Sequence, residues 1–294
     1  MGGREGFCHL ALRQHLFCSL FPDCRVNYYF CSLKKIWVAG KVCGLFKSNP
    51  APESRNSNIL ILKKYDFQQG EVLLFDKELD WTSFDLVRKV RNQLCRALGI
   101  KKLKVGHAGT LDPMATGLMI VCTGKATSRI ESLQAGEKEY LATLKLGATT
   151  PSFDRETGED QQYAVDHISR ELLLEVLQKF TGDQLQVPPL FSAVKIDGKR
   201  AYQHARKGEN VVLAARPVQI RELELLDFEN SLVTIRVTCS KGTYIRALAR
   251  DIGIALHSGA YLVQLRRTRI GGATVESAMT VNFFLDNLNE LVTN

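Results

Sequence analysis

The sequence predicts an α+β fold built on a mixed β-sheet. Segments with strand character outnumber those with helical periodicity. The two kinds do not alternate strictly along the chain, as they would in a doubly wound parallel sheet. Apolar residues make up 45% of the 294 residues and charged residues 24%, which is ordinary for a chain that buries a core. We therefore expect a globular α+β protein.

The first expected elements are a strand and a helix. Residues 70–77 are a short apolar run between polar residues, and Thr82 or Ser83 can cap the helix that follows. Two more strands are expected at 118–122 and 140–146, after a glycine-rich segment. The apolar positions that define the helix are Val87, Val90, Leu94 and Leu98.

The second half of the chain predicts two further helices and two strands. A helix begins at Ser169, and residues 191–196 predict a strand that enters an Asp-Gly turn. The strand signal is strongest at 232–239, where apolar residues alternate with Thr and Arg. Residues 244–256 carry one apolar helical stripe, formed by Ile245, Leu248, Ala249, Ile252 and Leu256.

Charge and cysteine content restrict the class of protein. Residues 1–65 contain ten Lys or Arg and three Asp or Glu, whereas residues 66–294 are nearly neutral, so global basicity is weak evidence for nucleic-acid binding by the main body. The chain has no stretch of about 20 apolar residues, which excludes a membrane-spanning helix. The dispersed Cys95, Cys122 and Cys239 lack C-x-x-C pairing, so we expect a cytoplasmic, metal-free body.

The first 65 residues predict an N-terminal extension that is disordered or non-native. They lack clear periodicity and end in a polar run rich in Ser, Asn and Pro. Their low acid content also permits a transit peptide, although no amphipathic basic face is present, so organelle targeting stays open. We expect the working domain at residues 66–294.

Two segments carry candidate chemistry. The glycine-rich loop 106–117 holds His107 and Asp112 but matches neither a Walker A motif nor a dinucleotide fingerprint. Standing before Pro113, Asp112 could also simply make a turn hydrogen bond. The second segment, 241–269, holds six basic residues and one acid, which suits a polyanionic partner. Its Arg246 could pair with a buried carboxylate, hold a phosphate or lie solvated.

Six motifs together resemble the TruB family of tRNA pseudouridine synthases in order and spacing. The resemblance implies a pseudouridine-synthase fold: a mixed, largely antiparallel sheet flanked by helices, with a central cleft. It also implies isomerisation of a T-loop uridine of tRNA, at position 55, by a monomer that needs no cofactor and no protein partner. Only 25 residues follow Arg269, so the short form without an RNA-binding PUA domain is expected. The motifs are Gly106-His-Ala-Gly-Thr-Leu-Asp-Pro-Met-Ala-Thr-Gly117, Lys138-Glu-Tyr140, Pro188-Pro-Leu-Phe-Ser-Ala-Val-Lys195, Tyr202-Gln-His-Ala-Arg206, Lys241-Gly-Thr-Tyr-Ile-Arg246 and Leu265-Arg-Arg267.

The same resemblance assigns roles to residues. Asp112 is the expected catalytic carboxylate, Tyr140 stacks on the target base, and Arg246 keeps the carboxylate ionised and oriented. His107 is expected to enter the T-loop in place of the extruded base. Tyr244 and Leu265 are expected to line the uracil pocket, and Lys241, Arg267 and Arg269 to bind the RNA. Ala108 and Phe191 depart from the Thr and Tyr that the family often has, at supporting positions.

Two other functions fit parts of the sequence. A non-catalytic RNA-binding or tRNA-folding protein would use the same scaffold, although intact Asp112, Tyr140 and Arg246 favour catalysis. A glycoside hydrolase using Asp112 with Asp154 would explain a nucleophile but not the arginine cluster.

Overall fold

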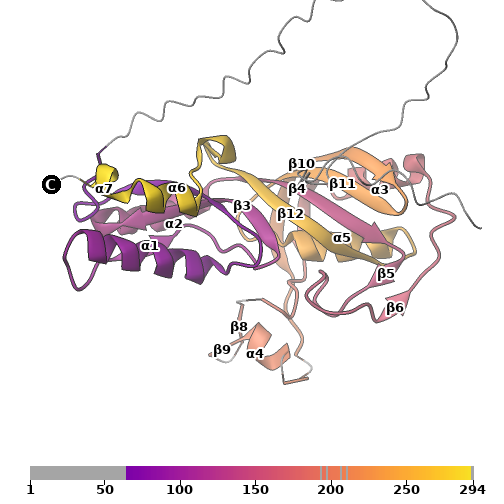
Figure 1. Ribbon diagram of the computed structural model, residues 1–294. Coiled ribbons are helices and arrows are strands. Elements are labelled where there is room, and N and C mark those ends of the chain that lie inside the picture. The colour runs from indigo at the N-terminus through magenta and orange to yellow at the C-terminus, as the bar shows by residue number, and fades with distance from the viewer. Residues whose placement is uncertain (1–63, 193, 197, 206, 210, 293–294) are drawn as a thin grey trace, which may run out of the picture. The chain divides into compact units, whose positions relative to one another are not determined.

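A nine-stranded mixed sheet organises the computed structural model, which describes residues 64–292 except 193, 197, 206 and 210 (Figure 1). The spatial order is β1-β3-β12-β4-β11-β10-β7, with β2 paired to β3 and β13 paired to β12. Within this sheet only β12 and β3 run parallel, so the predicted mixed, largely antiparallel sheet is confirmed. The strands are β1 (Val72–Lys77), β2 (Val105–His107), β3 (Ala115–Thr123), β4 (Lys138–Leu146), β7 (Gly182–Gln186), β10 (Arg216–Glu229), β11 (Leu232–Cys239), β12 (Ala260–Ile270) and β13 (Ala273–Thr274).

The parallel contact between β3 and β12 requires a glycine. Gly117 faces Arg267 across this pair and has a φ of +104°, a conformation that L side chains rarely adopt. A Cβ atom at Gly117 would lie 2.3 Å from the main-chain oxygen of Arg267, so no side chain fits there. The glycine of the loop motif therefore brings β3 against β12, and with it the loop that precedes β3.

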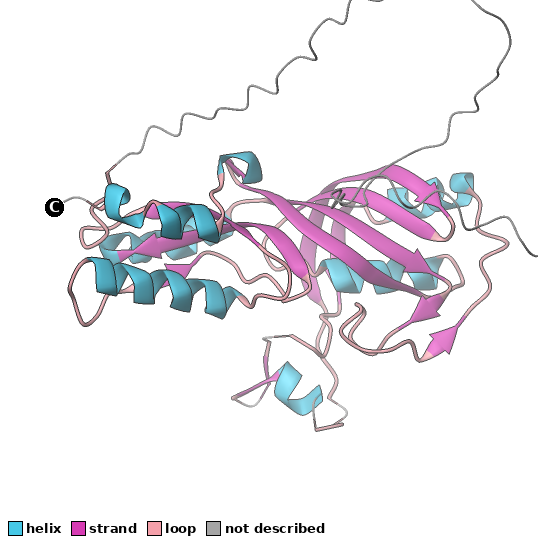
Figure 2. Cartoon of the chain, in the orientation of Figure 1, coloured by secondary structure: helices cyan, strands magenta, loops and turns pink. Residues whose placement is uncertain are grey.

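The longer helices α1, α3 and α5 pack on the sheet through apolar stripes (Figure 2). Helix α1 begins with a capping box, in which the Thr82 hydroxyl accepts from the Asp85 main-chain N–H and the Asp85 carboxylate accepts from the Thr82 main-chain N–H. The stripe of α5 is buried as predicted. The helices are α1 (Ser83–Ala97), α2 (Ile130–Ala135), α3 (Arg170–Lys179), α4 (Ala201–Ala205), α5 (Ile245–Ala255), α6 (Val281–Asp286) and α7 (Leu288–Leu291), with 3₁₀ turns η1 (Gly124–Arg129) and η2 (Val275–Ser277).

The expected strand at 191–196 is largely wrong. Of the described residues in that range, only those of β8 (Lys195–Ile196) pair, with β9 (Lys199–Arg200), in an excursion between β7 and β10 that also carries α4 (Figure 1). The Ser192 N–H donates to the Leu190 carbonyl two residues earlier, as in a turn. A second short pair, β5 (Ala148–Thr149) with β6 (Gln161–Gln162), follows β4.

Most other expected elements are confirmed. The strands at 70–77, 118–122, 140–146 and 232–239 correspond to β1, β3, β4 and β11, and the helices expected at Ser83, Ser169 and Tyr244 are α1, α3 and α5. No helix in the described part of the chain is long and apolar enough to cross a membrane. Nearly all of the predicted N-terminal extension, residues 1–63, lies outside the described residues.

Candidate active site

A pocket of about 360 Å³ opens where the 109–112 loop, β4, β12 and the start of α5 meet. This volume is in the range of small-ligand sites. Seven of the predicted site residues line it, among them Lys241 at the turn between β11 and α5. The residues that line it include Asp112, Tyr140, Ser192, Lys241, Tyr244, Arg246, Leu265 and Arg267.

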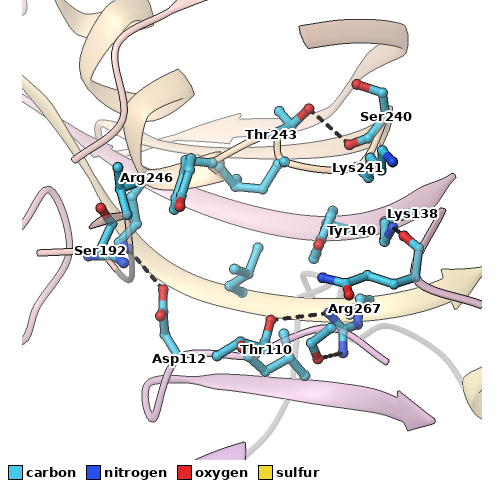
Figure 3. Close-up of a pocket in the computed structure, with 18 of the residues that line it drawn as sticks. Thr110, Asp112, Lys138, Tyr140, Ser192, Ser240, Lys241, Thr243, Arg246 and Arg267 are labelled. Atoms are coloured by element: carbon cyan, nitrogen blue, oxygen red, sulfur yellow. Dashed lines mark hydrogen bonds and ion pairs between the residues drawn. The ribbon is translucent and has the colours of Figure 1, made fainter. Parts of the chain in front are cut away.

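Asp112 and Arg246 form an ion pair at one end of this pocket (Figure 3). The Arg246 Nε lies 2.9 Å from the Asp112 Oδ2. The side chain of Arg246 is 5% exposed, and its Nη atoms donate to the carbonyls of Ser152 and Phe191. Its Nε also lies 3.5 Å from a carboxylate oxygen of Asp154, itself buried. Of the three environments considered for Arg246, the structure shows the buried carboxylate partner.

The environment of Asp112 works against its ionisation. Burial raises the pKa of Asp112 above its usual value, and the Asp154 charge adds to the rise, whereas Arg246 and Lys77 lower it. The side chain is 39% exposed and lines the pocket. Arg246 therefore offsets part of the cost of desolvation and fixes the direction of the carboxylate.

Ser83 holds the residue before Asp112. Its hydroxyl donates to the Leu111 carbonyl at 2.9 Å and accepts from the Leu111 N–H at 2.8 Å, and both residues are buried. On the other side of Asp112, the carbonyl of Pro113 accepts from the Asp80 N–H at 2.9 Å. The loop is thus fixed on both sides of the carboxylate by the start of α1 and by the turn after β1.

Two buried cations complete the support of this loop. The fully buried Lys77 donates to the carbonyls of Glu78 and Trp81, with the Pro113 carbonyl at 3.5 Å, and burial lowers its pKa to about 8. Arg267, 1% exposed, donates from its guanidinium to three carbonyls. Those carbonyls belong to Gly109, Thr110 and Leu118.

Tyr140 and Leu265 lie on the adjacent strands β4 and β12 and line the pocket. Tyr140 on β4 is 8% exposed and pairs in register with Arg267 on β12, two residues beyond Leu265. Burial raises the pKa of the Tyr140 phenol. An aromatic ring and an aliphatic side chain at this place offer flat apolar contact to a base.

Gln186 positions Tyr244. The Gln186 side-chain amide accepts from the Tyr244 N–H at 2.8 Å and donates to the Tyr244 carbonyl at 3.1 Å. Tyr244 is the N-cap of α5, so this pair of bonds also fixes the start of the helix that carries Arg246. The sequence does not mark Gln186, Ser83 or Lys77 as site residues. Gln186 and Ser83 contact main-chain groups far along the chain, and Lys77 reaches the loop only through the Pro113 carbonyl.

Three residues predicted to contact RNA each have their own surroundings. Arg267 lines the pocket, but its guanidinium is buried and donates to three main-chain carbonyls. Arg269 lies away from the pocket lining, 3.8 Å from Glu139. His107 on β2 is half-buried outside the pocket; burial lowers its pKa, and its Nδ1 lacks a hydrogen-bond partner within the described residues.

A group of exposed cations lies elsewhere, on α1, the following turn and η1. We call this set the α1–β2 basic surface. Among the residues that the structure describes, only Arg88 of this set forms an ion pair, with Asp85. The sequence between Thr82 and Lys104 holds seven basic residues and one acid, a signal that could have identified the surface. Its members are Arg88, Lys89, Arg91, Arg96, Lys101, Lys102, Lys104 and Lys125, of which all but Arg91 are exposed.

A metal site and a pair of catalytic carboxylates are two other arrangements that acidic residues can form. Within residues 64–292 apart from the four gaps, no group of three His, Cys, Asp or Glu side chains is arranged to hold a metal ion. Asp154 does not present a second free carboxylate, because its Oδ1 accepts from the Ser152 hydroxyl and the Glu156 N–H. The arrangement expected of a glycoside hydrolase is therefore not supported.

Known proteins match this chain over most of its length. Residues 96–245 match the family described as TruB family pseudouridylate synthase (N terminal domain). The tRNA pseudouridine synthase B of Phocaeicola vulgatus is 60% identical over 225 residues, which cover 76% of this chain and 96% of that protein. That of Parabacteroides distasonis is 59% identical over 227 residues, covering 77% and 97%. A chain in the crystal structure of a Cbf5-Nop10-Gar1 complex is 29% identical with a TM-score of 0.56, covering 76% of this chain and 55% of that one.

Proposed function

Because the chain belongs to the TruB family of pseudouridylate synthases, we propose that it isomerises a uridine in the T-loop of tRNA, at position 55, to pseudouridine. The observation that carries this proposal is the Asp112–Arg246 ion pair at the end of a pocket lined by Tyr140 and Leu265. A carboxylate fixed beside a flat apolar surface is what the rearrangement of a nucleoside requires.

The reaction breaks the bond from C1′ to N1 and joins C1′ to C5. The C5 hydrogen leaves as a proton and N1 gains one, so no electrons are exchanged and no cofactor is needed. We assign Asp112 as the nucleophile, attacking either C1′ of the ribose or C6 of the base. Arg246 holds the attacking carboxylate ionised although burial favours its protonated form.

The target uridine must leave the T-loop stack to reach Asp112. Flipping a base costs a few kcal/mol, and stacking on Tyr140 recovers part of this cost. Tyr244 and Leu265 bound the uracil in this arrangement. We assign to His107, on the strand leading into the Asp112 loop, the place in the T-loop that the base leaves.

Phosphates of the tRNA are bound by the α1–β2 basic surface. Lys102, Lys104 and Lys125 line one shallow depression there, and β2 connects Lys104 directly to His107 and the Asp112 loop. Exposed cations exchange counterions for phosphates, whereas the buried Arg267 cannot. Lys241, at the far end of the pocket from Asp112, adds a contact near the target nucleotide (Figure 3).

The working unit is residues 66–294, acting as a monomer without a protein partner. All groups assigned to catalysis lie within this segment of one chain. We place the reaction in the cytoplasm, since the described cysteines Cys95, Cys122 and Cys239 are free thiols, as a reducing compartment permits.

Mapping pseudouridine in tRNA from cells that lack this protein tests the proposed function. We expect the T-loop uridine to stay unmodified while other pseudouridines persist. The wild-type gene should restore the modification, and a gene encoding Asp112→Asn should not. Restoration by the Asn variant would instead favour a tRNA-folding protein, because binding would then suffice.

A further inference from the structure

Ser192 carries a buried hydroxyl that the described protein leaves unused. Its side chain is 5% exposed, and its Oγ has no hydrogen-bond partner among the described residues. The main chain of the same residue is fixed, because its N–H donates to the Leu190 carbonyl and its carbonyl accepts from the Tyr202 N–H. Buried hydroxyls nearly always find a partner, so a group held in place without one suggests a ligand as partner.

The Ser192 hydroxyl lies at the same end of the pocket as the Asp112–Arg246 ion pair. Ser192 lines the pocket beside Asp112 and Arg246, opposite Lys138 and Lys241 (Figure 3). The carbonyl of the preceding residue, Phe191, accepts from the Arg246 Nη2 at 2.9 Å. This hydrogen bond therefore links the Asp112–Arg246 ion pair to the main chain beside Ser192.

The chemistry of the target nucleotide then limits what Ser192 can meet. If the uracil stacks on Tyr140 and Asp112 acts at C1′ or C6, the ribose lies at the Asp112 end. Within an RNA chain the 3′ and 5′ oxygens are esterified, so the 2′-hydroxyl is the one free hydroxyl of the ribose. It is carried by C2′, the carbon bonded to C1′. It both donates and accepts, as the Ser192 hydroxyl does.

We propose that the Ser192 hydroxyl is a positioning contact for the ribose 2′-hydroxyl of the target uridine, and that it makes the pocket prefer RNA to DNA at this nucleotide. This inference rests on the proposed function. The contact fixes the sugar relative to the Asp112 carboxylate and satisfies a hydroxyl that otherwise stays buried without a partner.

Substrates that differ in one atom test the contact. The wild-type protein and Ser192→Ala are assayed with a T-arm stem-loop RNA carrying uridine at the target position. The same RNA with 2′-deoxyuridine there is tested as a competitive inhibitor, so that its own turnover is not needed. We expect Ser192→Ala to lower kcat/KM for the uridine RNA on the order of fivefold, as for one neutral hydrogen bond. The inhibition constant of the deoxy RNA should change less than about twofold, because the partner is already absent.

A second buried serine serves as the control. Ser258 is 6% exposed, but its hydroxyl donates to the Ala164 carbonyl at 3.0 Å, outside the pocket. Ser258→Ala should lower the melting temperature and leave the ratio between the two RNAs unchanged. Ser192→Ala breaks no bond within the described protein, so its melting temperature should equal that of the wild type.

Equal losses with both RNAs, or no loss with the uridine RNA, would overturn the ribose contact. A lowered melting temperature of Ser192→Ala with an unchanged ratio between the RNAs would show a structural role and overturn it too. A wild-type protein that leaves the target uridine unmodified would overturn the proposed function itself, and this result is visible without any variant.

Discussion

The position of Asp112 depends on one hydroxyl. Ser83 bonds both main-chain groups of Leu111, the residue before Asp112, and Leu111 is 4% exposed. Ser83→Ala removes both bonds and leaves the Leu111 N–H and carbonyl without these partners in a buried place. We expect this change to destabilise the fold and to displace the Asp112 carboxylate.

The size of the effect follows from the two groups left unpaired. A buried polar group without a partner costs about 1–3 kcal/mol, which gives roughly 2–6 kcal/mol for two. Partial relaxation favours the lower half of this range, about 3 kcal/mol. In a folded unit of roughly this size, 1 kcal/mol lowers Tm by about 2–4 °C, so we expect a decrease of roughly 6–12 °C. A shift of about 1 Å in Asp112 costs on the order of 10²-fold in kcat.

Thermal unfolding and single-turnover kinetics measure these two effects separately. Ser132→Ala is the matched control, since Ser132 is exposed and its hydroxyl bonds only to the Arg129 carbonyl three residues earlier. This control should keep both Tm and kcat. If Ser83→Ala unfolded at the wild-type temperature and kept its kcat, the hydroxyl would not support the loop and the reasoning would be refuted.

Three further changes separate binding, ionisation and metal dependence. Lys104→Ala should weaken tRNA binding and lower the slope of log K against log salt by about one. Arg267→Ala should lower the stability of the protein and leave this slope unchanged. The reverse pattern in a binding titration would contradict the assignment of phosphate binding to the α1–β2 basic surface. The pKa of Asp112 is raised above the usual 3.8, so kcat/KM should begin to fall at a pH above 3.8 as the solution is acidified. The reason is that the proposed nucleophile is the ionised carboxylate. A pH–rate profile that is flat down to pH 4 would contradict this prediction. Activity should persist in EDTA once the tRNA is folded; zinc-dependent recovery after chelation would refute this.

The sequence predicted those helices and strands that have one apolar, buried face and one polar face. The apolar stripes of α1 and α5 and the alternation in β11 mark one buried face each, and all three elements are observed. β12 escaped prediction, although it lies at the centre of the sheet. Its burial does not alternate, and it holds Arg266, Arg267 and Arg269, which resemble an exposed basic run.

The site was predictable where motifs carry it and not where distant contacts define it. The resemblance identified Asp112, Tyr140 and Arg246, which the fold brings to one pocket. Arg267 was expected to bind RNA because the basic run at 241–269 suits a polyanionic partner. Its carbonyl partners lie about 150 residues away in the chain, at Gly109, Thr110 and Leu118, and only the folded structure brings them together.

Incubation with an unmodified tRNA transcript tests the central assignment most directly. The wild-type protein and Asp112→Asn are each incubated with the transcript, pseudouridine is mapped at nucleotide resolution, and tRNA affinity is measured in parallel. The wild type should convert the T-loop uridine, and Asp112→Asn should leave it unmodified while binding tRNA within a few-fold of the wild type. Pseudouridine formed by the Asn variant at an appreciable rate, or none formed by the wild type, would contradict the account.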